Sequence, residues 1–248
     1  ADHVISLVGI LHETKGNTFE TVQAKGPMLV GKIAREKNVR SLVHVSAIGA
    51  DVNSKSLYAS SKGLGETYIR DEFEKTVILR PSIIFGPDDN FFNRFANLAA
   101  FAPFLPLIGG GTTKFQPVYV QDVASAIMVA LEDSAKVGND YELGGPSIYS
   151  FRELLELLEK HTLRKRALVN IPFFLASLQA KFLEILPNPP LTRDQVQLLK
   201  ADNIVSQDAL TLQDLGISPT SCEAVLPTYL DRFRPGGRYN RSRLTTSS

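Results

Sequence analysis

Cysteine is almost absent from this 248-residue chain, and neither sign of charge is in excess. The single Cys222 can form no intrachain disulfide and has no neighbouring cysteine or histidine at metal-ligand spacing, which fits a reducing compartment and argues against structural zinc. Lysine and arginine total 27 against 26 aspartate and glutamate residues, so no overall field attracts nucleic acid or anionic lipid. Apolar residues make up 44% of the chain, enough for one large domain, or for one domain with a small lobe. We therefore expect a soluble protein that binds its ligands locally, without nucleic acid and without a metal.

Targeting and membrane-spanning segments are also missing from the pattern. No basic leader with an apolar core follows Ala1, so no secretory or organelle signal is predicted within these residues. The segment 91–108 is apolar, but Asn93, Arg94, Asn97 and two prolines interrupt it. No transmembrane span is expected there.

What the sequence does contain is an alternation of short apolar runs and helical patterns. The run 2–9 is mostly apolar and ends in glycine, as expected for a buried parallel strand beside a ligand. Further strands are predicted over 39–46, 76–79, 118–120 and 140–143, and helices over 18–37, 57–73, 90–101, 123–131 and 151–161. Because each parallel crossover needs a helix, this order predicts an α/β fold with a doubly wound parallel sheet.

Several element ends carry local signals. Pro81 is expected to halt the strand before it, and Asp122 to cap the following helix at 123–131. Ser150 and Glu153 have the spacing of a capping box for the helix at 151–161.

The last third of the chain is expected to form a smaller, mostly helical lobe over 161–235. Segment 172–186 is predicted to be an amphipathic helix. Its apolar face carries Phe174, Leu178, Phe182, Ile185 and Leu186. We expect this face to pack on the protein's own core, with a membrane surface or a partner protein as the alternative. The segment 236–248 is basic and poor in apolar residues, so it is predicted to be disordered.

One stretch carries a pattern with chemical meaning. Ser46 follows a predicted strand, at the edge where open α/β sheets bind ligands, and Tyr58 and Lys62 share a helix face four residues apart. A lysine ammonium near the phenol would favour the phenolate and could bind ribose hydroxyls, while Ser46 could stabilise charge on a carbonyl oxygen. Tyr-x-x-x-Lys also arises by chance on solvated helices. Of the seven tyrosines only Tyr58 has the lysine, and its position after a strand favours an active-site reading.

The order of these motifs resembles the extended and atypical short-chain dehydrogenases/reductases, which are similar to NAD-dependent epimerases/dehydratases. The resemblance covers residues 2–160 and rests on VISLVG, HVSAIGA, YASSKGLGE, VILRPSIIFGP, FQPVYVQDVASAI and YELGGP. It implies an NAD(P)-binding, Rossmann-like domain over 1–160, with substrate-region insertions at about 87–117. The later segment LTRDQVQLLKADNIVSQDALTLQDLGISP is similar to the C-terminal lobe of one subgroup, the accessory nucleotide-binding subunits of respiratory complex I and their alpha-proteobacterial relatives.

The resemblance implies a role for particular residues. Tyr58 and Lys62 match the catalytic tyrosine and lysine of the family, and Ser46 matches its catalytic serine. Val8 and Gly9 match the part of the family's chain that passes the nicotinamide-side ribose. Pro81 and Ile84 match the loop that lies against the nicotinamide, and Arg80 fits the same strand end. The implied cofactor is NAD(H) or NADP(H), and the complex I resemblance favours NADP(H).

Two departures from the family pattern bear on activity. No Gly-x-x-Gly-x-x-Gly turn precedes the strand at Val4, although the family binds the pyrophosphate there. The N-terminal strands of the fold are therefore expected to be missing, which would correspond to roughly 60 to 80 residues at about 30 residues per βαβ unit. The loop between Ser46 and Tyr58 is also shorter than in the active members of the family.

Two functions follow as expectations. The first is an accessory or assembly subunit of NADH:ubiquinone oxidoreductase (complex I) with little or no turnover, bound peripherally to the cytoplasmic or mitochondrial-matrix face of the respiratory membrane. The second is an active NAD(P)-dependent oxidoreductase, epimerase or dehydratase of the cytoplasm, acting on a nucleotide-sugar or a similar hydroxyl or carbonyl substrate. The Tyr58/Lys62 pair favours the enzyme, whereas the similarity of the C-terminal lobe favours the subunit.

Overall fold

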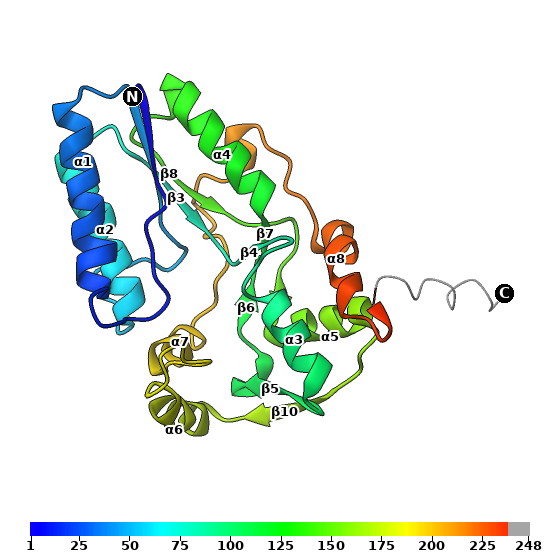
Figure 1. Cartoon of the computed structure of the whole chain (residues 1–248). Coiled ribbons are helices and arrows are strands. Elements are labelled where there is room, and N and C mark those ends of the chain that lie inside the picture. Colours follow the sequence, from blue (N-terminus) through cyan, green and yellow to red (C-terminus); the bar gives the residue numbers. More distant parts are fainter. Residues whose placement is uncertain (238–248) are drawn as a thin grey trace.

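A four-stranded parallel sheet lies at the centre of the computed structural model, which describes residues 1–237 (Figure 1). The strands run in the order β1-β2-β3-β8, with Ser6 beside His44 and Leu79 beside Tyr141 in the register. Their bounds are β1 His3–Ser6, β2 Ser41–Val45, β3 Val77–Pro81 and β8 Asp140–Leu143. Helices cover both faces of this sheet, which confirms the predicted doubly wound α/β fold. The prediction of disorder over 236–248 falls, from residue 238 onward, outside the described residues.

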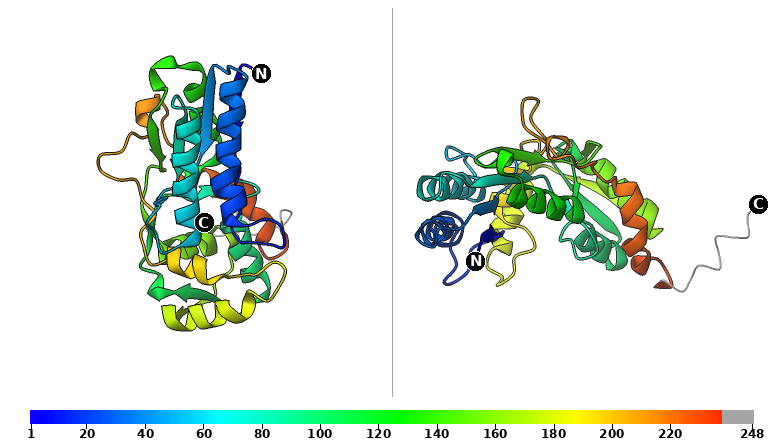
Figure 2. Two further views of the ribbon diagram at one scale, coloured as in Figure 1. Left: turned by 90° about the vertical axis from the view of Figure 1, so that its left-hand side faces the viewer. Right: turned by 90° about the horizontal axis from the view of Figure 1, so that it is seen from above.

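The two faces of the sheet have different covers. On one face, Leu42 packs with Ala34 of α1 (Gly26–Glu36) and Ile69 of α2 (Leu57–Glu72). On the other, Val43 packs with Ala126 of α4 (Val120–Glu132). Alternate residues of β2 thus point to opposite faces, as pleated backbone requires. Figure 2 shows α1 and α2 side by side along one side of the sheet.

Glycines allow the helices on that side to approach closely. The predicted helix at 18–37 is present as a π-helical turn (Glu20–Lys25) that runs into α1. A Cβ atom on Gly65 would lie 2.1 Å from the backbone oxygen of Gln23, and one on Gly31 would lie 2.9 Å from the oxygen of Ile69. Any larger side chain at Gly65 would therefore push α2 away from α1.

Three details differ from the sequence prediction. β1 is an edge strand and is only partly buried: Ile5 within it and Leu7 just after it are exposed. Pro81 does not stand beyond β3 but is its last paired residue, opposite Leu143 of β8. Asp122 does not cap α4, which begins earlier at Val120; its carboxylate accepts hydrogen bonds from Thr220 instead.

A second hydrophobic core lies beside the sheet domain. It joins α3 (Phe92–Phe101), α5 (Phe151–Thr162) and α8 (Cys222–Leu230) with β5 (Phe104–Ile108). The predicted capping box of Ser150 and Glu153 begins α5. β5 pairs in parallel with β10 (Ala167–Ile171), and neither strand was predicted. The shorter pairs are β4 (Ile84–Phe85) with β7 (Val118–Tyr119) and β6 (Lys114–Phe115) with β9 (Tyr149–Ser150).

Single-turn 3-10 segments and one short α-helix complete the secondary structure. The 3-10 turns span Gly109–Gly111, Ser134–Lys136, Gln213–Leu215 and Asp231–Phe233. The short helix α7 spans Arg193–Leu198. After α7 the chain returns to the sheet domain, where Leu212 and Leu215 pack in the core beneath α4.

The orientation of α6 (Phe173–Leu183) corrects the prediction for segment 172–186. Ala176 and Ala180 are its buried residues, and they pack with Ile108 and Val196. The opposite face, which was expected to pack inward, is exposed and carries Phe174, Leu178 and Phe182; Ile185 and Leu186, which follow the end of the helix, are exposed as well. The small alanine side chains let the helix approach the core more closely than the bulky face could. Figure 2 (left) shows α6 lying across one end of the molecule.

Within residues 1–237, no helix has both the length and the apolar composition needed to cross a bilayer.

Candidate functional site

The carboxyl ends of β1, β2 and β3 converge at one edge of the sheet. The N–H of Ser46 donates to the carbonyl of Leu79 at 2.7 Å, and that of Ile48 donates to Pro81 at 3.0 Å. These two bonds extend the pairing of β2 with β3 beyond the regular strands. The loop after β2 is therefore held against the end of β3, where ligands bind in open α/β sheets.

Lys62 connects this edge to helix α2. Its buried ammonium donates to the carbonyl oxygens of Val45, at 3.0 Å, and Val8, at 3.4 Å. A Cβ atom on Gly9 would lie 3.5 Å from the same Nζ atom. Burial lowers the Lys62 pKa to about 8, an effect that the carboxylate of Glu66 opposes. The structure thus brings Val8, Gly9 and Lys62 together, as the sequence predicts.

Tyr58 lies one helical turn before Lys62 on α2 and is half-buried. Its ring meets that of Phe19 edge-on, with 6.1 Å between the centroids. Burial raises the Tyr58 pKa to about 12, so the phenolate is less accessible than in an ordinary tyrosine. This corrects the expectation that Lys62 favours the phenolate, since the lysine ammonium is directed at two backbone carbonyls. As it stands, Tyr58 can donate a proton but is a poor base.

Ser46 has an unpaired hydroxyl. Its side chain is buried, and its Oγ atom has no hydrogen-bond partner among residues 1–237. A buried hydroxyl without a partner is unfavourable by about 1–3 kcal/mol, so this atom is a natural contact for a polar ligand group. The neighbouring residue His44 is also buried, and burial lowers its pKa to about 3. His44 is therefore neutral at physiological pH.

Gln23 is a residue of this site that the sequence interpretation missed. It is fully buried in the π-helical turn, where its Oε1 accepts from the N–H of Ile10 at 3.0 Å and its Nε2 donates to Ser61 Oγ at 2.8 Å. It therefore holds the loop after Gly9 against the helix that carries Lys62. Sequence periodicity did not predict Gln23, because the residue lies in a π-helical turn, whose spacing differs from that of an α-helix.

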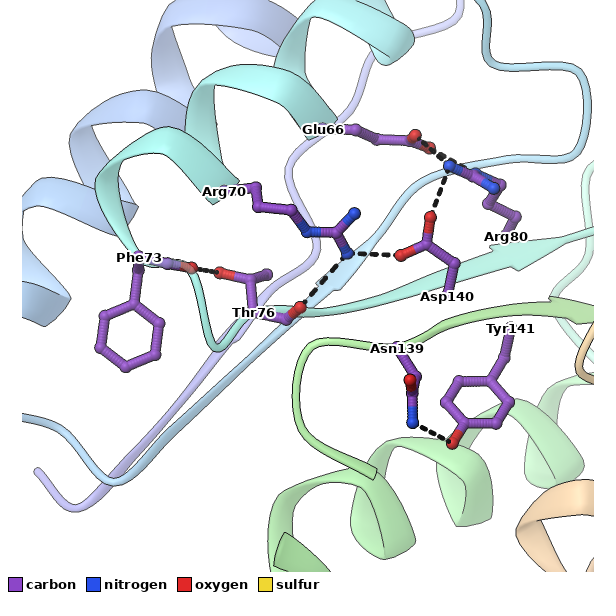
Figure 3. Close-up of polar contacts among 8 residues, drawn as sticks. All are labelled: Glu66, Arg70, Phe73, Thr76, Arg80, Asn139, Asp140 and Tyr141. Atoms are coloured by element: carbon purple, nitrogen blue, oxygen red, sulfur yellow. Dashed lines mark hydrogen bonds and ion pairs between the residues drawn. The ribbon is translucent and has the colours of Figure 1, made fainter. Parts of the chain in front are cut away.

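A partly buried ionic network begins at Glu66, one helical turn after Lys62 on α2 (Figure 3). Arg80 donates to both oxygens of Glu66, at 2.9 and 2.6 Å, and to Asp140 at 2.9 Å. Arg70 binds the other oxygen of Asp140. The hydrogen bond with Glu66 raises the Arg80 pKa further. Arg80 lies near the end of β3, where the sequence interpretation placed it, and its side chain fastens α2 to the sheet.

The remaining predicted residues lie farther along the same edge. Pro81 is buried at the end of β3, and Ile84 is half-buried in β4, where it pairs with Val118. Between them, the hydroxyl of Ser82 donates to Asn203. Asn203 comes from the C-terminal lobe, so this contact could not be read from local sequence.

No group of three or more metal-ligating side chains occurs within the described part of the chain. The arrangement instead suits a ligand with hydroxyls and a carbonyl. Lys62 has three donors, of which two are used, so one remains for a hydroxyl group. Ser46 and Tyr58 are the groups with a hydroxyl to offer to a carbonyl oxygen or its alcohol. No glycine-rich strand–turn–helix that could bind a pyrophosphate is among residues 1–237.

Comparison with known proteins agrees with this geometry. The sequence profile described as the NAD dependent epimerase/dehydratase family matches residues 2–144. The chain is 34% identical to "NADH dehydrogenase (ubiquinone) 1 alpha subcomplex subunit 9, mitochondrial" of Arabidopsis thaliana, over 96% of this chain and 62% of that protein. The protein of the same name from Mus musculus is also 34% identical, over 93% of this chain and 62% of its own length. The chain therefore spans less than two thirds of these curated relatives.

Among solved structures, the dTDP-glucose 4,6-dehydratase DesIV of Streptomyces venezuelae, with NAD and TYD bound, has a TM-score of 0.71. The superposition covers 97% of this chain and 74% of DesIV, at 19% sequence identity. At that identity the likeness is one of fold.

Proposed function

This chain belongs to the NAD dependent epimerase/dehydratase family, and from that premise we propose that it binds NAD(H) or NADP(H) as an accessory subunit of complex I. One observation carries the dinucleotide proposal. The Lys62 ammonium is fixed between the carbonyls of Val8 and Val45, beside Gly9, with one donor still available. The free donor suits a ribose hydroxyl.

Each residue would have a distinct role toward the dinucleotide. Lys62 would bind the nicotinamide-side ribose, Val8 and Gly9 would form the floor beneath it, and Pro81 and Ile84 would bound the nicotinamide. Ser46 and Tyr58 would face a substrate carbonyl or hydroxyl. When bound, the nicotinamide would supply hydride transfer, as it does in dinucleotide enzymes generally. The proposal of NADP(H) over NAD(H) rests on the similarity to complex I subunits alone.

The accessory role is supported by two features. The curated relatives are named as subunits of NADH dehydrogenase, and their similarity extends over the C-terminal lobe as well as the sheet domain. In addition, the phenol of Tyr58 has a raised pKa, about 12, which disfavours its use as a base and fits slight turnover or none. Its place would be the mitochondrial-matrix or cytoplasmic face of the respiratory membrane.

A peripheral contact with that membrane or its complex is part of the same proposal. The exposed face of α6 presents Phe174 and Phe182 to solvent, together with the exposed Lys181, and the exposed Ile185 follows just after the helix. A helix that lies flat, with large apolar side chains outward and a cation among them, suits a membrane interface. The exposed apolar area has no partner among the described residues that would cover it.

The experiment uses the full-length native protein. The small molecule released on denaturation is identified by mass spectrometry, and the proteins that copurify are identified from the same preparation. A dinucleotide in near-equal amount together with complex I subunits is the expected result. A protein that never retains or binds a dinucleotide would contradict the proposal.

An active oxidoreductase is the second candidate, supported by the spacing of Tyr58 and Lys62 on α2 and by the unpaired Ser46 hydroxyl. The enzyme would bind its dinucleotide loosely, would be found free of complex I, and would oxidise or reduce members of a panel of nucleotide-sugars. The variant Tyr58→Phe separates the two candidates, since it would abolish turnover while an accessory subunit would still assemble.

A further inference from the structure

A carboxylate of the C-terminal lobe caps the helix that carries Tyr58. Asp194 Oδ1 accepts from the N–H of Leu57 at 2.7 Å, and its Oδ2 accepts from the N–H of Tyr58 at 3.1 Å. Oδ2 also accepts from the hydroxyl of Ser56 at 2.8 Å, and that hydroxyl in turn accepts from the N–H of Ala59 at 3.2 Å. Helix α2 therefore has its first three N–H groups satisfied, two of them by a residue 136 or more positions away.

Helix starts are usually capped by the residue just before them, because a side chain there reaches the free N–H groups without further cost. In α2 that residue, Ser56, satisfies only one N–H. The two others depend on a charge from another part of the chain, and a carboxylate at a helix N-terminus also interacts favourably with the helix dipole. The position of Tyr58 is thus tied to the docking of α7.

Asp194 is itself held firmly in α7. Thr192 and Gln195 form a capping box, in which Thr192 Oγ1 accepts from the N–H of Gln195 at 3.1 Å and Gln195 Oε1 accepts from that of Thr192 at 3.3 Å. Val196, on the other side of the short helix, is buried against α6. The carboxylate consequently points at α2 from a helix with little freedom of its own.

Asn203, nine residues later, makes the corresponding contacts with the other loops of the site. Its Nδ2 donates to the carbonyl of Ile48 at 3.2 Å, two residues after Ser46. Its Oδ1 and its backbone oxygen both accept from the hydroxyl of Ser82, at 2.7 and 2.9 Å, one residue after Pro81. Segment 192–203 therefore spans the candidate site and touches each chain segment that follows β2 or β3.

We propose that segment 192–203 is a clamp that makes dinucleotide binding depend on the docking of the C-terminal lobe. Asp194 and Asn203 act as positioning residues: Asp194 sets the start of the helix that carries Tyr58 and Lys62, and Asn203 sets the loops beside Ser46 and Pro81. The inference rests on the proposed dinucleotide site.

The physical basis is thermodynamic linkage. The contacts of the clamp with the sheet domain are mainly hydrogen bonds, and α7 has a single buried apolar side chain, Val196. Segments with few buried apolar contacts open locally at low free energy. A ligand that binds only when the clamp is closed loses apparent affinity in proportion to the closed fraction, and in turn it raises that fraction.

The test measures dinucleotide affinity and amide hydrogen exchange of the full-length protein, using NADH and NADPH as probes. Asp194→Asn keeps the shape of the side chain but loses the charge that two N–H groups and a hydroxyl share. We expect this variant to bind the dinucleotide about tenfold more weakly, the size expected for losing charge-assisted hydrogen bonds. Asp214→Asn is the matched control, because the Asp214 carboxylate bonds only locally, to Thr211.

Hydrogen exchange distinguishes a positioning role of Asp194 from a merely structural one, because only a positioning role predicts protection that depends on the ligand. In the wild type, dinucleotide addition should slow exchange at Leu57, Tyr58 and across 192–203, and this ligand-dependent protection should be lost in Asp194→Asn. Equal affinity and equal protection in wild type and variant would overturn the clamp while leaving the dinucleotide site intact. If the variant does not fold, hydrogen exchange of the wild type is the test. A dinucleotide that binds without slowing exchange across 192–203 would then overturn the clamp. A wild type that binds neither dinucleotide overturns the proposed function and the clamp together.

Discussion

The ammonium of Lys62 donates a 3.0 Å hydrogen bond to the carbonyl oxygen of Val45, the residue immediately before Ser46. The end of β2 and helix α2 are therefore joined by a single buried charge, with a pKa of about 8. Because this pKa lies near physiological pH, the charge that would hold a ribose titrates within an accessible pH range.

We expect dinucleotide affinity to fall as the pH rises above about 8. Binding through the Lys62 ammonium requires the charged form, so the dissociation constant should be flat below pH 8 and should rise about tenfold per pH unit above it. Calorimetric titration between pH 6.5 and 9.5 measures this. Lys62→Met should bind weakly with no such dependence, and Lys55→Met, at an exposed lysine of the preceding loop, should behave as wild type.

His44 should make the protein sensitive to mild acid. Burial and the Lys62 charge lower its folded pKa to about 3, whereas the unfolded chain takes up the proton near pH 6.5. The unfolded state then binds more protons than the folded state between these values, so stability is lost as the pH falls below 6.5, by up to about 1.4 kcal/mol per pH unit. Urea unfolding at pH 7, 6 and 5 tests this. A His44→Gln variant with the same slope as wild type would contradict it.

Removing one charged partner from the partly buried ionic network should lower the free energy of unfolding. Glu66→Gln leaves Arg80 without its bidentate carboxylate, and we expect a loss of about 2–3 kcal/mol in the free energy of unfolding. Glu156→Gln removes an exposed pair with Arg152 and should change stability by less than about 0.5 kcal/mol. Chemical denaturation of both variants provides the comparison, and equal losses would show that burial of the network is unimportant.

The two faces of α6 should respond in opposite ways. Ala180→Leu adds bulk against Ile108 and Val196 and should destabilise the protein by about 1–3 kcal/mol. Phe182→Ser changes a side chain that is already 65% exposed, so stability should stay within about 0.5 kcal/mol. The same serine variant should lose association with membranes or with complex I, measured by flotation with liposomes and by copurification. Retained association would show that another surface makes the contact.

Much of the sheet domain could be predicted because its signals are local. The apolar run at 39–46 predicted β2, and the Ser150/Glu153 spacing predicted the start of α5. β5 and β10 were missed, because each pairs only with the other, some 60 residues apart, and a proline interrupts the first. The Tyr58/Lys62 helix was placed correctly, but the carbonyls that hold Lys62 come from Val45 at the end of β2 and from Val8 in the loop after β1.

Residues that reach the site from distant segments could not be predicted from the local sequence. Gln23 lies in a π-turn whose packing against α2 depends on Gly65, and Asn203 reaches the site only because the chain returns from the C-terminal lobe. Sequence spacing states which side chains share a face, but not which other element that face meets.

By itself the amino-acid sequence determined the order of strands and helices, the helix that pairs Tyr58 with Lys62, and the apolar stripe of segment 172–186. These depend on preferences that act over a few residues, through backbone sterics, capping and side-chain periodicity. Only the tertiary structure decided that Ala176 and Ala180 face inward, that the pKa of the Tyr58 phenol is raised, and that Asp194 caps its helix. Those outcomes depend on which distant surfaces fit most closely and which charges they bury, and packing of the whole chain settles both.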